Sequence, residues 1–163
     1  MKIAYDHQIF SGQKYGGISK YYYQLAKNIS KTQNMVRIFS PIHRNAYITD
    51  LSPELIKGVK LNSYPFGRYG DRLVTEVNRV LLKPILNQYK PDIIHETFYS
   101  KRKSGGKKVT TVITVYDMIH ELYDSYLPPY QRGWAEKKIS VDRADHIICI
   151  SENTKKDLIN LFN

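Results

Sequence analysis

A run of β-branched residues in the second half of the chain constrains the fold more than any other stretch. The run, residues 109–115, reads VTTVITV, and the polar or titratable residues Tyr116, Asp117, His120 and Glu121 follow it. An apolar run of this kind, with threonine interspersed, is typical of an inner strand of a parallel sheet. In open α/β sheets, ligands bind in the crevice outside the carboxyl ends of the strands. The cluster after the run is therefore the first candidate for a functional site.

The rest of the chain alternates strand and helix patterns. This alternation predicts a Rossmann-like, doubly wound α/β fold, with a mostly parallel sheet and helices on both faces. Pro84 lies inside a helical pattern and should kink or split that helix. The strands are expected at residues 2–6, 35–40 (ending at Pro41), 59–64, 91–95, 109–115 and 146–150, and the helices at 18–29, 71–89, 128–143 and 154–162.

One connection conflicts with this topology. The link from residue 95 to residue 109 contains the basic stretch KRKSGGKK and shows no helical pattern. Parallel crossovers usually need a dozen or more residues and a helix. Either the link is unusually tight, or the strand boundaries differ from those expected.

The composition limits the class of protein. The chain has 163 residues, of which 42% are hydrophobic, enough for one globular domain with a core. The first residues, MKIAYDHQIF, lack a long apolar region, and no run has the apolar length needed to span a bilayer. Cys149 is the only cysteine, which excludes an intrachain disulfide. A reducing, cytoplasmic location is the expectation.

The chain is strongly basic, with 25 Lys and Arg against 15 Asp and Glu and a net charge of +10. Such a charge suits nucleic acid, an anionic membrane surface or an anionic small molecule. A solubility effect would account for it equally well. No nucleic-acid-binding motif is present, so nucleic acid is not an expected partner. A peripheral contact with the inner face of an anionic membrane remains an expectation.

The residues after the run could serve as acid–base groups or as weak metal ligands. Asp117, His120 and Glu121 do not have the spacing of the helical H-E-x-x-H arrangement, and no metal is expected. His95 ends the preceding strand pattern, so it should open onto the same edge as Asp117 and His120. The convergence of two strand ends favours a functional interpretation.

Gly16 and Gly17 lie between the first strand and the first long helix. Two glycines let the backbone approach a ligand closely, and a helix N-terminus favours an anion. The segment does not match G-x-G-x-x-G. An ordinary turn is therefore the simpler interpretation of this pair when it is considered alone.

Several segments, taken in order, resemble the N-terminal domain of a family 4 glycosyltransferase with the GT-B fold. They are residues 16–18 (GGI), 90–95 (KPDIIH), 114–121 (TVYDMIHE) and 144–158 (ADHIICISENTKKDL). In that family two Rossmann-like domains face each other across a cleft. The first mainly holds the acceptor, and the second mainly binds the nucleotide-sugar. The resemblance implies that residues 1–163 form the single N-terminal, acceptor-binding domain and that the nucleotide-sugar domain lies outside this chain.

The resemblance implies a retaining hexosyltransferase that uses a nucleotide-sugar donor and a glycan or lipid-linked glycan acceptor in polysaccharide assembly. The donor comes with the other domain, so no cofactor is expected in this chain, which should fold alone but be inactive. Many relatives carry His where this chain has Tyr116, and the alternative is a non-catalytic glycan- or protein-binding module. The resemblance makes Asp117, His120 and Glu121 the catalytic candidates, and Gly16, Gly17 (both approaching the donor diphosphate), His95, Tyr116, Ser151 and Glu152 the substrate-binding candidates.

Overall fold

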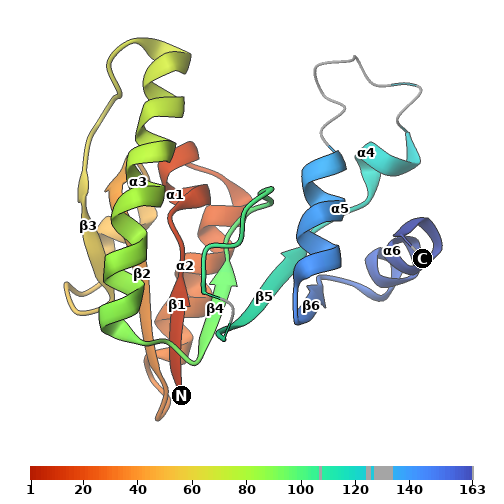
Figure 1. Ribbon diagram of the computed structural model, residues 1–163, viewed down its shortest axis with the longest axis horizontal. Coiled ribbons are helices and arrows are strands. Elements are labelled where there is room, and N and C mark those ends of the chain that lie inside the picture. The colour runs from red at the N-terminus through yellow and green to blue at the C-terminus, as the bar shows by residue number, and fades with distance from the viewer. Residues whose placement is uncertain (107, 124–125, 127–133, 163) are drawn as a thin grey trace.

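The structure is a computed structural model that describes residues 1–106, 108–123, 126 and 134–162. Its strands form one sheet in which every neighbouring pair is parallel, in the order β3-β2-β1-β4-β5-β6 (Figure 1). The chain thus starts in the middle of the sheet and builds outward in both directions, which confirms the doubly wound α/β fold. The strands are β1 (Lys2–Tyr5), β2 (Met35–His43), β3 (Ile56–Lys60), β4 (Ile93–Glu96), β5 (Thr110–Val115) and β6 (His146–Cys149).

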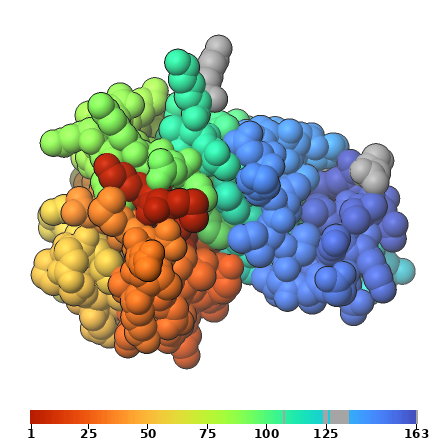
Figure 2. Space-filling view, turned by 90° about the horizontal axis from the view of Figure 1, so that it is seen from below, coloured from red at the N-terminus to blue at the C-terminus, as the bar shows by residue number. Residues whose placement is uncertain are grey.

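Helices cover both faces of the sheet. They are α1 (Gln8–Gly12), α2 (Gly17–Ile29), the 3-10 helix η1 (Tyr47–Asp50), α3 (Gly67–Tyr89), α4 (Ile119–Leu122), α5 (Trp134–Arg143) and α6 (Glu152–Phe162). α2 packs on one face and α3 on the opposite face. Residues 97–106 lie between α3 and α5 (Figures 1 and 2).

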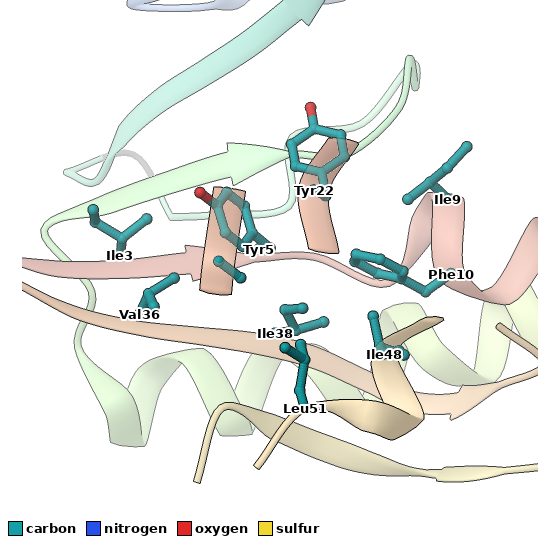
Figure 3. Packing of buried hydrophobic residues seen from close by; sticks show 10 residues of the cluster. Ile3, Tyr5, Ile9, Phe10, Tyr22, Val36, Ile38, Ile48 and Leu51 are labelled. Atoms are coloured by element: carbon teal, nitrogen blue, oxygen red, sulfur yellow. The ribbon is translucent and has the colours of Figure 1, made fainter. Parts of the chain in front are cut away.

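The largest part of the core lies between the sheet and α2. In β1, Ile3 and Tyr5 belong to this side and Ala4 to the α3 side, because successive side chains of a strand point to opposite faces. Tyr22 of α2 is fully buried, and its ring lies 5.3 Å from that of Tyr5 (Figure 3). The apolar stripe of α2 therefore packs on the first strand and fixes the loop between them.

The second strand is longer than expected. It continues through Pro41 to His43, and its register against β3 shifts between Phe39 and Ile42. At this irregularity Asn78 of α3 replaces the missing ladder bonds. It accepts from the Ile42 backbone N–H at 2.7 Å and donates to the Ile42 carbonyl at 2.8 Å. A proline is tolerated there because it lies where regular pairing is already interrupted.

Two further boundaries differ from the expectations. The third strand is Ile56–Lys60 rather than residues 59–64, and it lies at the edge of the sheet. Helix α3 begins at Gly67 and includes Pro84 without being divided there. The prolines at 128 and 129, expected to start a helix, lie outside the described residues.

The short link between the fourth and fifth strands is real. β4 and β5 are parallel neighbours, and residues 97–106, 108 and 109 contain no helix. Side chains satisfy the loop backbone in place of a helix. Ser140 of α5 accepts from Ser100 N at 2.9 Å and donates to Ser100 O at 3.0 Å, and Glu96 accepts from Ser104 N at 2.7 Å.

Within the part of the chain that the structure describes, no helix combines the length and the apolar character needed to cross a membrane.

Candidate functional site

The cluster after β5 is organised by a lysine of α5. Lys137 is buried, and its Nζ donates to the Asp117 carbonyl at 2.9 Å and to Glu121 Oε2 at 2.7 Å. The side chain of Glu121 is only 4% exposed, whereas that of Asp117 is 46% exposed. Glu121 is thus half of a buried ion pair, and Asp117 presents its carboxylate to solvent. His120 is exposed on α4.

The backbone directs Asp117 outward. Its Oδ1 accepts from the Ile119 N–H at 3.2 Å at the start of α4, and it lies 3.9 Å from Lys137 Nζ. Met118 is buried against Ile113 and Val115 of the strand. The apolar anchor and the buried lysine hold this turn in one position, so the exposed carboxylate is fixed at the carboxyl end of β5.

His95 does not open onto this edge, contrary to the expectation. Its side chain points to the α2 face and is 4% exposed. Its Nε2 lies 2.8 Å from Thr114 Oγ1 and 3.3 Å from the Tyr22 hydroxyl. The imidazole therefore fills the interior between β4, β5 and α2, and it is not brought together with Asp117 and His120.

Burial lowers the pKa of His95 from its ordinary value of 6.5 to about 4. Between these values the unfolded chain binds a proton that the folded chain excludes, so stability should fall as the pH falls from 6.5 towards 4. We expect the free energy of unfolding, measured with urea, to fall between pH 7 and pH 4.5 by about 2–3 kcal/mol more in the wild type than in His95→Gln. His7, whose pKa burial also lowers, is common to both proteins. Equal pH dependence in the two proteins would contradict the buried, neutral imidazole.

Gly16 and Gly17 lie at the N-terminus of α2, as expected. Gly17 is exposed, and a Cβ added to it would meet nothing within 4 Å. The Ser19 hydroxyl donates to the Gly16 carbonyl at 3.0 Å and fixes the first turn. Gly17 is thus open to an approaching ligand, whereas the Gln13 side chain lies against Gly16. Anions are favoured at such a helix end.

Tyr116 connects α2 with the end of β5. Its ring packs edge-on against Tyr21 with centroids 5.9 Å apart, and its hydroxyl is buried. Burial raises the pKa of this phenol, so Tyr116 is neutral at physiological pH. It provides packing against α2 rather than an ionisable group.

Ser151 and Glu152 start α6 beside the same edge. Ser151 Oγ accepts from the Thr154 N–H at 3.1 Å, which makes Ser151 the N-cap of this helix. Thr154 Oγ1 donates to the Tyr116 carbonyl at 3.4 Å, so the first turn of α6 is attached to the end of β5. Glu152 is exposed. The hydroxyl of Ser151 is occupied by this cap.

The ends of β1 and β4 carry buried carboxylates that the sequence reasoning missed. Asp6 is 1% exposed. It accepts from Thr97 N at 2.9 Å, from Thr97 Oγ1 at 2.6 Å and from Ser104 Oγ at 2.6 Å. Glu96 is equally buried. Both directly follow or end an apolar strand, which is the signal that singled out Asp117, and it could have identified them.

Arg143 of α5 neutralises Glu96. Its Nη1 donates to Glu96 Oε1 at 3.0 Å and its Nη2 to Oε2 at 2.5 Å. The same Nη2 lies 2.9 Å from Ser100 O and 3.3 Å from Arg102 O. Burial raises the pKa of Glu96, and the guanidinium opposes that shift. This pair holds the β4–β5 loop to α5.

In the described ranges, no group of three or more His, Cys, Asp or Glu residues could hold a metal ion. The exposed groups at the carboxyl edge are instead a carboxylate at Asp117, an imidazole at His120 and the amides at the start of α2. Chemically, such an edge can hydrogen-bond sugar hydroxyls through the carboxylate and attract an anion to the helix end.

Comparison with known proteins identifies a family and a solved structure to which this chain is similar. The model of Glycosyltransferase Family 4 matches residues 15–163. The crystal structure of UGT89C1 from Arabidopsis thaliana, complexed with UDP, superposes with a TM-score of 0.52 at 11% identity. That superposition covers 96% of this chain and 46% of UGT89C1, and at this identity it shows the shared fold. No curated protein matches the chain.

Proposed function

The chain belongs to glycosyltransferase family 4, and on that premise we propose that it is the acceptor-binding half of a retaining glycosyltransferase. The transferred group is a hexosyl unit, the donor a nucleotide-sugar, and the acceptor a glycan or a lipid-linked glycan. The nucleotide-sugar domain lies outside these residues. The match to only 46% of UGT89C1 supports this two-domain arrangement.

The observation that carries the proposal is the fixed, half-exposed carboxylate of Asp117 at the end of an inner strand. Transfer with retention develops positive charge on the sugar and negative charge on the leaving diphosphate. Asp117 is suited to a polar contact with the reacting sugars, and the amides at the start of α2 are suited to the diphosphate. Glu121 and Lys137 position the Asp117 turn through their buried pair.

A non-catalytic glycan- or protein-binding module is the second candidate. Tyr116 favours it, because a buried phenol stands where many relatives carry a His. A panel of nucleotide-sugars, tested for hydrolysis and transfer by the two-domain protein, separates the two. Turnover of one donor supports the enzyme. Glycan binding without turnover of any donor would establish the module instead.

We place the protein in the cytoplasm, in peripheral contact with the inner face of the membrane. The net charge of +10 supports this placement, because it favours an anionic lipid surface. The protein should sediment with liposomes that contain anionic lipid and stay in the supernatant with neutral ones. Equal partitioning would remove the membrane contact from the account.

A further inference from the structure

A cavity of about 550 Å³ opens between α3, the β4–β5 loop and the start of α5. Residues 75–83 of α3 form one wall and residues 99–104 of the loop form the other. His7 and Gln8, at the start of α1, also line the cavity. Its volume is in the range of small-molecule sites. Asp117, His120 and the glycine pair do not line this cavity.

The charged side chains that line the cavity are mostly cations. Five of its side chains are Lys or Arg, against two carboxylates, Glu76 and Glu136. Arg79 pairs with Glu76, and Lys103 pairs with Asp145. The remaining cations are Lys83, Lys101 and Arg102, for which no ion pair is present among the described residues.

These three cations come from both walls. Lys83 lies on α3, whereas Lys101 and Arg102 lie on the loop, and all three side chains are exposed. Like charges that face one another across a cavity repel unless an anion lies between them. An anion held between the two walls would relieve this repulsion.

The loop wall is fixed before any ligand arrives. Arg143 holds the carbonyls of Ser100 and Arg102, and Ser140 holds both backbone groups of Ser100. A preformed wall avoids the cost of ordering a loop on binding.

The cavity borders the cluster at the end of β5. Tyr99 lines the cavity, and Lys137 Nζ lies 5.5 Å from the centroid of its ring. Glu136, the neighbour of Lys137 on α5, also lines it. A ligand in the cavity would lie one side chain away from the lysine that holds the Asp117 turn.

We propose that this cavity binds the anionic group of the acceptor, a phosphate or a carboxylate carried by the glycan. The identification of the ligand as the acceptor rests on the proposed function. The anion specificity rests on the cations alone. The acceptor class is then a phosphorylated or acidic glycan, with its anion in the cavity and its sugar towards Asp117.

The test is calorimetric titration of the chain with inorganic pyrophosphate, with glucuronate and with neutral glucose. We expect Lys83→Gln, Lys101→Gln and Arg102→Gln combined to weaken binding of the preferred anion about tenfold or more. The matched control neutralises the exposed lysines Lys27, Lys57 and Lys156, which lie outside the cavity, and should bind as wild type does. Preference for pyrophosphate would indicate a phosphorylated acceptor, and preference for glucuronate an acidic sugar.

Equal weakening in both triple variants would overturn the proposal, because it would reduce the effect to overall charge. Binding of neither anion by wild type would also overturn it. Neither result bears on the proposed transferase activity, because donor turnover by the two-domain protein tests that activity separately. If the cavity binds pyrophosphate or glucuronate but the two-domain protein turns over no donor, the anion site would stand. Its assignment to the acceptor would then be wrong.

Discussion

Arg143→Met is expected to lower the free energy of unfolding by about 3–5 kcal/mol, the usual cost of removing one partner of a buried ion pair. The Glu96 side chain is 0% exposed, so its charge would remain in the interior without a counter-ion. The carbonyls of Ser100 and Arg102 would lose a donor as well. Urea unfolding at neutral pH measures the loss.

A control on the same helix separates burial from charge. Lys138 forms an exposed pair with Asp142, with side chains 39% and 53% exposed, and Lys138→Met should cost less than about 1 kcal/mol. Combining Arg143→Met with Glu96→Gln should recover part of the loss, because it removes the stranded charge. Similar losses for Arg143→Met and Lys138→Met would contradict the buried pair.

Asp117→Asn should lower the turnover of the two-domain enzyme by about 100-fold or more, the scale for a positioned carboxylate at a reacting group. Because the side chain is 46% exposed, the melting temperature should change little. Asn also keeps the oxygen that accepts from Ile119. Steady-state kinetics and a thermal melt measure the two effects.

Asp50→Asn is the matched control, since Asp50 is an exposed carboxylate on η1, and it should leave turnover unchanged. A large fall in the melting temperature of Asp117→Asn, with normal turnover per folded molecule, would show instead that Asp117 is structural.

The strand–helix alternation was predictable, and so was the edge at which the polar cluster lies, because both follow from local patterns. The β-branched run became β5, and Asp117 and His120 follow its carboxyl end. The face to which His95 points was not predictable. A strand pattern shows where a residue lies along the chain, but which neighbours cover each face depends on how the helices pack.

The buried polar contacts were also beyond local reasoning. Glu96 and Arg143 are 47 positions apart in the chain, and only the parallel pairing of β4 with β5 brings α5 over Glu96. Asp6 and Ser104, which are 98 positions apart, are likewise brought together only when β1 pairs with β4. Pro41 appeared to end a strand, because the compensating side chain, Asn78, belongs to a helix much later in the chain.

The central claim, that this chain is one half of a transferase, is tested most directly by sugar transfer from a nucleotide-sugar donor to acceptor glycans, including phosphorylated ones. Residues 1–163 alone and the two-domain protein are compared at equal concentration. The account predicts transfer by the two-domain protein and none by residues 1–163, because the proposal assigns donor binding to a domain outside them. Measurable transfer by residues 1–163 alone would contradict it.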